Sequence, residues 1–166
     1  MKTNVLSILV ENRAGTLSRV AGLFSRRGFN IDSLTVGETE VPDVSRMTIA
    51  VKDDGNVLEQ IVKQLSKLVD VISIRKLDNE NCIKREILLV KVKSDEKNRS
   101  AIVEVAAIFR SRVIDISAST ITIEATGSFE KLNGLLCLLR PYGVLELART
   151  GLVALERGPK VLSEDG

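Results

Sequence analysis

The chain has 166 residues, 44% of them hydrophobic and 28% charged, which indicates a soluble globular protein with one ordinary domain or two small ones. Its net charge of only +2 gives no strong attraction to nucleic acid or to an anionic membrane, and no run approaches the roughly 18 apolar residues of a membrane span. Histidine is absent, which excludes Ser-His-Asp and Cys-His catalysis and every histidine metal site, and the remaining titratable residues form no recognisable catalytic motif.

The apolar run 5–10 predicts a buried strand, and the polar turn 11–16, which contains a glycine, separates this strand from a helix. The helix is expected to begin after Thr16 as its N-cap and to end at Arg26, Arg27 and Gly28. Its apolar face repeats at i, i+3, i+4 and i+7 and comprises Leu17, Val20, Ala21 and Phe24.

Two further strands are expected around 30–37 and 45–51, and Pro42 with Asp43 suits the hairpin between them. A second helix and a fourth strand, 71–77, complete the order βαββαβ. The apolar face of the second helix comprises Leu58, Ile61, Val62, Leu65, Leu68 and Val69.

The same pattern then starts again. Residues 79–84 predict a linker between a first domain, 1–78, and a second domain, 85–166, because the polar stretch after 77 has no apolar periodicity. The second domain is expected to contain strands at 87–92, 113–119, 120–126 and 144–148, and a frayed tail at 163–166. The apolar faces of its two helices comprise Ile102, Val105, Ala106 and Phe109, and then Phe129, Leu132, Leu136 and Leu139.

Two βαββαβ units in tandem predict an α+β protein with two ferredoxin-like domains, each an antiparallel sheet with both helices on one face. Domains of about 80 residues are small for independent stability, and each leaves one face of its sheet without helices. Pairing of sheet faces or edges between subunits would stabilise these small domains and cover the sheet face that has no helices. We therefore expect a homodimer.

The first strand–helix turn has a glycine, Gly15, whereas the equivalent turn of the second domain, 94–98, has none. A glycine just before a helix lets a ligand approach the free N–H groups of the helix start, where a carboxylate binds well. After the helix, Asn30 offers a side-chain amide to an ammonium or a carboxylate group, so the two loops could together hold a free amino acid. The alternative is that Gly15 and Asn30 only serve tight turns.

Two further groups of residues do not predict a functional site. Asp53, Asp54 and Asn56 lack the remaining ligands of a calcium loop and are better explained as a turn, so no metal site is expected. The two cysteines, Cys82 and Cys137, are isolated and fit free thiols in a cytoplasmic protein better than a disulfide.

The run LVENRAGTLSRV at 9–20 resembles the opening of an ACT domain, an amino-acid-sensing module of metabolic enzymes. Four further stretches resemble the small subunit of acetohydroxyacid (acetolactate) synthase, and the match extends over nearly the whole chain. These stretches are 28–36, 45–49, 64–71 and, at the start of that family's second domain, 85–92.

The resemblance implies a regulatory subunit of branched-chain amino-acid biosynthesis, with no catalytic residues and no cofactor of its own. Its partner, the catalytic large subunit, would carry thiamine diphosphate, magnesium and usually FAD, and would convert two pyruvates to acetolactate and carbon dioxide. The small subunit would activate that enzyme and confer feedback inhibition by valine or a related branched-chain amino acid. In this sequence the family's effector contacts and their neighbours fall on Asn12, Ala14, Gly15, Leu17, Asn30 and Ile31.

Two other functions share features with this pattern. A free-standing tandem-ACT sensor acting on another enzyme or on a transcriptional regulator remains an alternative. RNA binding is set aside, because an RNA-recognition motif needs aromatic residues on its central strands, and 5–10 and 46–51 contain none.

Overall fold

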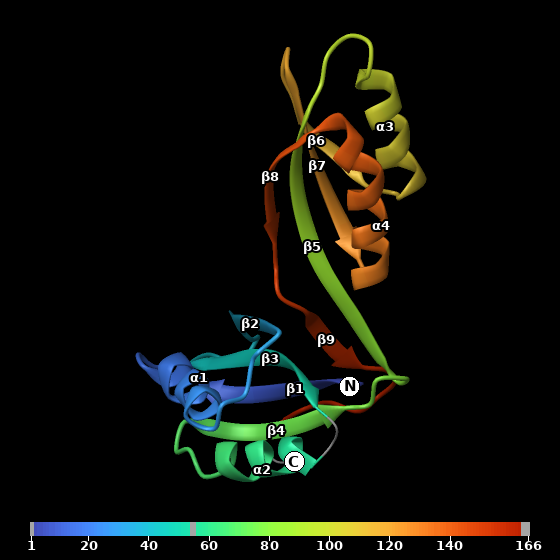
Figure 1. The fold of residues 1–166 in the computed structure, drawn as a ribbon. Helices are drawn as coiled ribbons and strands as arrows, with labels where there is room; N and C mark the ends of the chain where they lie inside the picture. Colours follow the sequence, from blue (N-terminus) through green and yellow to red (C-terminus); the bar gives the residue numbers. More distant parts are fainter. Residues whose placement is uncertain (1, 54–55, 164–166) are drawn as a thin grey trace. The chain divides into compact units, whose positions relative to one another are not determined.

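The computed structural model describes residues 2–53 and 56–163 of the chain. The chain divides into two compact units, one formed by the residues up to Ile83 together with those from Leu152 onward, and the other by Lys84–Gly151. Each unit is an antiparallel sheet with two helices on one face (Figure 1). The α+β class and the repeated βαββαβ order are therefore confirmed.

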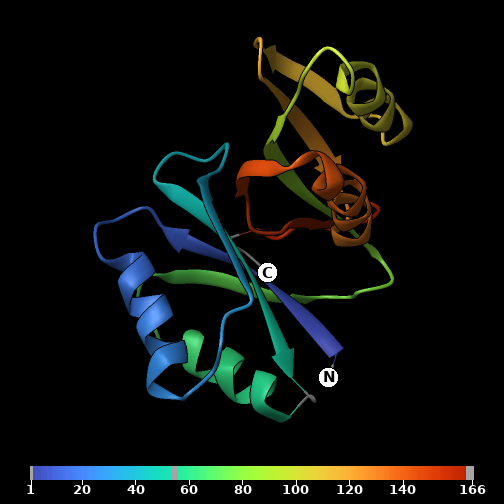
Figure 2. The same ribbon diagram turned by 45° about the horizontal axis from the view of Figure 1, so that its top comes forward.

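The first unit has the strand order β2-β3-β1-β4, in which β1 lies between β3 and β4 and β2 is an outer strand (Figure 2). Antiparallel pairing of β1 with β3 extends along the full length of both strands. The elements of this unit are β1 (Lys2–Glu11), α1 (Thr16–Arg26), β2 (Ser33–Glu38), β3 (Val44–Asp53), α2 (Asn56–Leu65) and β4 (Val71–Leu77).

The core of the first unit lies between the sheet and its helices, because alternate strand residues point to the helix face. Leu17, expected on the apolar face of α1, is 45% exposed, and Leu23 occupies the core in its place. Val69, which follows the end of α2 at Leu65, is 89% exposed. The core comprises Leu6, Ile8, Val10, Val20, Leu23, Phe24, Met47, Ile49, Val51, Leu58, Ile61 and Leu65.

The second unit has the strand order β6-β7-β5-β8, with α3 and α4 packed on one face of its sheet. Its core repeats that of the first unit, since Leu88, Val90 and Val92 of the central strand β5 meet the helices. The remaining elements are β5 (Cys82–Lys93), α3 (Arg99–Ile108), β6 (Arg112–Ile116), β7 (Thr120–Gly127), α4 (Phe129–Leu139), a 3-10 turn (Arg140–Tyr142), β8 (Val144–Arg149) and β9 (Val153–Glu156).

The domain boundary differs from the expected linker at 79–84 in two respects. Strand β5 already begins at Cys82, because it runs without interruption from the first unit into the second. The chain also returns to the first unit, since β9, which the sequence analysis did not anticipate, pairs with β5, and Leu152 belongs to the first unit. The second compact unit therefore ends at Gly151, whereas the second domain was expected to continue to 166.

The returning segment covers part of the helix-free face of the first sheet. Val5 and Ala50 of that face are buried beneath Leu152 and Ala154. The backbone N–H of Leu152 donates to the hydroxyl of Ser33 over 2.7 Å, at the start of β2. Part of the face that was expected to need a second subunit is thus covered by the chain itself.

Two expectations reach beyond the described residues. They are the turn expected at Asp53, Asp54 and Asn56, of which Asp54 is not described, and the expected frayed tail, of which 164–166 are not described. In the portion of the chain that the structure describes, no helix is both long and apolar enough to cross a membrane.

Candidate functional site

The turn between β1 and α1 is built around Gly15. This residue is the N-cap of α1 and has a left-handed backbone, with φ of +86° and ψ of −11°, a conformation that glycine adopts without the penalty of a Cβ. The expectation that Thr16 is the N-cap is wrong: Thr16 is the first helical residue, and it is buried. Gly15 is therefore needed here for its backbone.

The start of α1 has no side-chain cap. Gly15 has no side chain that can cap the helix, and the first turn contains no acidic residue. In α4, by contrast, the hydroxyl of Ser128 accepts the backbone N–H of Lys131. The N–H groups at a helix start have no partners within the helix and carry the positive end of its dipole, so the α1 turn can accept a carboxylate.

Asn12 connects this turn to β2. Its side-chain amide donates to the carboxylate of Glu38, the last residue of β2, over 2.9 Å, and its backbone N–H donates to the carbonyl of Asp43 over 2.7 Å. Ala14 and Leu17 are both exposed beside the turn. A polar group, an open helix start and two aliphatic side chains therefore occur together at this end of α1.

Asn30 and Ile31 lie at the other end of α1. The helix has 11 residues, which separates its ends by about 15 Å at the usual rise per residue. Asn30 is exposed, whereas Ile31 packs against the core of the first unit. One chain therefore does not bring Asn30 to Asn12 and Gly15.

Beside the turn, Arg19 and Asp70 form an ion pair. This pair was not predicted from the sequence. Arg19 donates from Nε to Oδ2 of Asp70 over 2.5 Å and from Nη2 to Oδ1 over 2.8 Å. Asp70 is only 4% exposed. These hydrogen bonds lower the pKa of Asp70 below its ordinary value, although burial opposes the shift, and they raise the pKa of Arg19.

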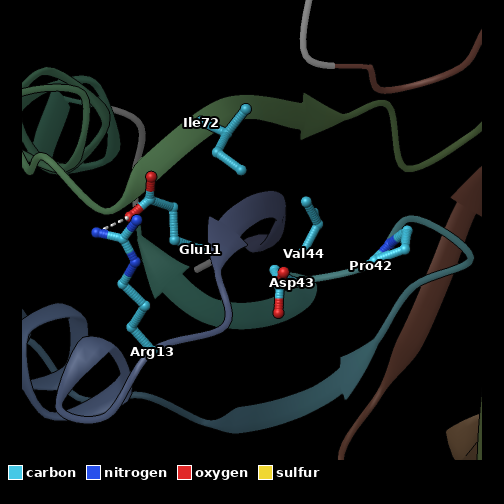
Figure 3. A pocket seen from close by; sticks show the side chains of 6 residues that line it. All are labelled: Glu11, Arg13, Pro42, Asp43, Val44 and Ile72. Carbon is cyan, nitrogen blue, oxygen red and sulfur yellow. Dashed lines mark ion pairs between the residues drawn. The ribbon is translucent and has the colours of Figure 1, made fainter.

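A pocket of about 280 Å³ lies beside the end of β1 (Figure 3). Glu11 and Arg13 on its rim are already paired with one another at 3.0 Å. No predicted effector residue lines it, so this pocket is not the site that the sequence predicts. It is lined by Glu11, Arg13, Pro42, Asp43, Val44 and Ile72.

Neither a disulfide nor a metal cluster lies near this turn. Cys82 is a buried free thiol and Cys137 an exposed one. Among residues 2–53 and 56–163, no group of three or more histidine, cysteine, aspartate or glutamate residues is placed to hold a metal ion. What the turn offers chemically is an uncapped helix start beside the polar side chain of Asn12.

Comparison with known proteins agrees with the two-part organisation of the chain. Residues 6–73 match the family model of the AHAS small subunit-like ACT domain, and residues 85–158 match that of the small subunit of acetolactate synthase. The acetolactate synthase small subunit of Mycobacterium bovis is 52% identical over 159 residues, which are 96% of this chain and 95% of that protein. The protein of the same name from Mycolicibacterium smegmatis is 51% identical over 158 residues, 95% of this chain and 93% of the relative.

A solved structure extends the likeness to the fold. The crystal structure of the acetolactate synthase small subunit from Thermotoga maritima superposes with a TM-score of 0.91 at 42% identity, covering 96% of this chain and all of that one. Both halves of the sequence and the three-dimensional fold therefore agree, and the chain belongs to the acetolactate synthase small-subunit family.

Proposed function

We propose that this chain is the regulatory subunit of an acetohydroxyacid (acetolactate) synthase, which activates the catalytic large subunit and confers feedback inhibition by valine or a related branched-chain amino acid. Membership of the small-subunit family supports the partnership with a large subunit. The observation that carries the sensing role is the open, glycine-built start of α1 next to Asn12. Thiamine diphosphate, magnesium and FAD would belong to the large subunit.

The effector would bind with its carboxylate at the start of α1. Gly15 lets the ligand approach the N–H groups of the first turn, and the helix dipole favours the negative charge. The amide of Asn12 is a second polar group on this side. Leu17, 45% exposed, and Ala14 would contact a branched aliphatic side chain.

A homodimer through β2 would complete the site. β2 is an outer strand of its sheet, so its free edge can pair with a copy of itself. Two such edges, related by a two-fold axis, run antiparallel and place the start of one strand opposite the end of the other. The start of β2 follows Asn30, and its end is bonded to Asn12. Asn30 of the partner subunit would therefore lie near Asn12 and Gly15.

Reconstitution with the cognate large subunit tests this function. The chain alone should form no acetolactate from pyruvate, and added to the large subunit it should raise the rate and create sensitivity to valine, leucine or isoleucine. An unchanged rate together with unchanged inhibition would refute the regulatory role. A chain that binds an amino acid in calorimetry but leaves the enzyme unaffected would instead be the free-standing sensor, and a pull-down from cell extract would identify its target.

A further inference from the structure

Asp70, the residue before β4, contacts the chain on both sides of the α1 turn. Its backbone carbonyl accepts the N–H of Glu11, at the end of β1, over 2.8 Å. Its carboxylate accepts two hydrogen bonds from Arg19, in the second turn of α1, over 2.5 and 2.8 Å. A bidentate arginine–carboxylate pair has a fixed planar geometry. One buried residue thus forms hydrogen bonds with both ends of segment 11–19.

The guanidinium that Asp70 holds also lies against Gly15. A Cβ built on Gly15 would stand 2.8 Å from Nη1 of Arg19 and 3.6 Å from Cζ. The guanidinium therefore occupies the volume in which any other residue at position 15 would place its side chain. The left-handed backbone of Gly15 and the orientation of Arg19 fit one another, and Asp70 fixes that orientation.

We propose that Asp70, acting through Arg19, is a positioning residue for the effector amino acid. It holds the backbone of 12–16 in the conformation that receives the carboxylate, so binding does not have to order that segment. This inference rests on the proposed function, because it requires the effector at the α1 turn. Asp70 itself touches no effector atom in this arrangement, since its carboxylate is occupied by Arg19.

The test compares Asp70→Asn, Arg19→Gln and the double variant in the reconstituted holoenzyme. Each variant is titrated with valine, leucine and isoleucine, and the inhibition midpoint is read relative to that variant's own uninhibited rate. We expect each single change to raise the midpoint by about tenfold, in the range found for coupled neighbours. The double variant should be no worse than either single one, because both remove the same pair.

Glu156→Gln is the matched control. It removes another arginine–carboxylate pair of the same unit, Glu156 with Arg75 at 3.3 Å, and with it the pair of Glu156 with Lys160 at 3.5 Å. Neither pair includes a residue of the α1 turn. This variant should lower the melting temperature as Asp70→Asn does, but should leave the inhibition midpoint unchanged. If the two ion pairs only stabilised the fold, the inhibition midpoint would shift in both Asp70→Asn and Glu156→Gln or in neither.

The outcomes separate the two proposals. If the wild-type holoenzyme responds to none of the three amino acids, the proposed function fails, and the positioning role fails with it. If the wild type responds, but Asp70→Asn keeps its midpoint or Glu156→Gln shifts as far, only the positioning role is overturned. Should Asp70→Asn not fold, Arg19→Lys keeps the charge without the bidentate contact and should still raise the midpoint, and an unshifted midpoint there would overturn the role.

Discussion

The side-chain amide of Asn12 donates to the carboxylate of Glu38 over 2.9 Å, although the two residues are 26 positions apart. This bond joins the turn before α1 to the last residue of the outer strand β2. A rearrangement at the β2 edge would therefore reach the α1 turn directly. The proposed dimer edge and the proposed effector site are therefore joined by a single hydrogen bond.

Gly15→Asp should abolish feedback inhibition while leaving activation by the subunit. The new side chain would meet Arg19 at 2.8 Å, would occupy a backbone with φ of +86°, and would add a negative charge where a carboxylate is to bind. The left-handed backbone alone costs a non-glycine residue roughly 1–2 kcal/mol. Titration of the reconstituted holoenzyme with valine, leucine and isoleucine measures the effect.

Gly22→Ala is the control for Gly15, because it lies in α1 with nothing within 4 Å of the added Cβ. This change should keep the wild-type inhibition curve and should stabilise the helix by up to about 1 kcal/mol. An unaltered inhibition curve for Gly15→Asp would place the effector elsewhere, whereas a loss of activation as well would make the turn purely structural.

Much of the fold followed from periodicity. Alternation in 45–51 and the i, i+3, i+4, i+7 repeat of the helices predicted the elements within a few residues, because a strand and a helix each bury one face. Strand β9 was missed, since four residues bounded by glycines have too short a pattern, and their burial depends on the distant Val5 and Ala50.

The site was less predictable than the fold. The glycine at position 15 marked the turn, and the structure accounts for it through a left-handed backbone. The Arg19–Asp70 pair gave no local signal, because its members are 51 positions apart and each resembles an ordinary surface charge in the sequence. The separation of Asn30 from Asn12 likewise depends on where α1 ends relative to the sheet, which residue spacing does not encode.

Leu152→Ala should destabilise the first unit. Leu152 is 9% exposed and packs on Val5 and Ala50, so its loss removes apolar contacts and uncovers the sheet. Buried leucine-to-alanine changes cost roughly 2–5 kcal/mol, and a site at the edge of a small cluster belongs near the lower end. Urea unfolding measures it. Val153→Ala, at a position 46% exposed, should stay within about 0.5 kcal/mol of wild type; equal losses for both variants would contradict a packing role for this segment.

The Arg19–Asp70 pair should make stability depend on pH in the acid range. The pKa of Asp70 is lower in the folded chain than its ordinary value of 3.8, so the folded state favours the carboxylate. Its stabilising contribution is then fully present above the unfolded pKa and is lost as pH falls through the lower, folded pKa. The difference in melting temperature between wild type and Asp70→Asn should hold from pH 8 to about 5 and vanish in stronger acid. A difference that grows on acidification would contradict the assignment.

The β2 edge should carry the dimer. Sedimentation equilibrium is expected to give a dimer at micromolar concentration, and a monomer there would refute it. Val36→Lys places a charge on the outer strand at a side chain that is 41% exposed, and charged residues on an edge discourage strand pairing. This variant should shift the chain towards monomer and reduce feedback inhibition with it, whereas Val103→Lys, 40% exposed on α3, should do neither.

Mixed dimers test whether the effector site is shared between two subunits. Asn12→Ala and Asn30→Ala should each weaken inhibition about 10- to 100-fold, the usual effect of losing a hydrogen bond to a charged group. In a dimer with one subunit of each kind, the two-fold arrangement places both changes in one site and leaves the other site intact. Tandem affinity tags isolate this species, and calorimetry should then find one binding site per dimer with wild-type affinity. If the site lies within a single chain, each site of the mixed dimer carries one change, and calorimetry should find no site with wild-type affinity.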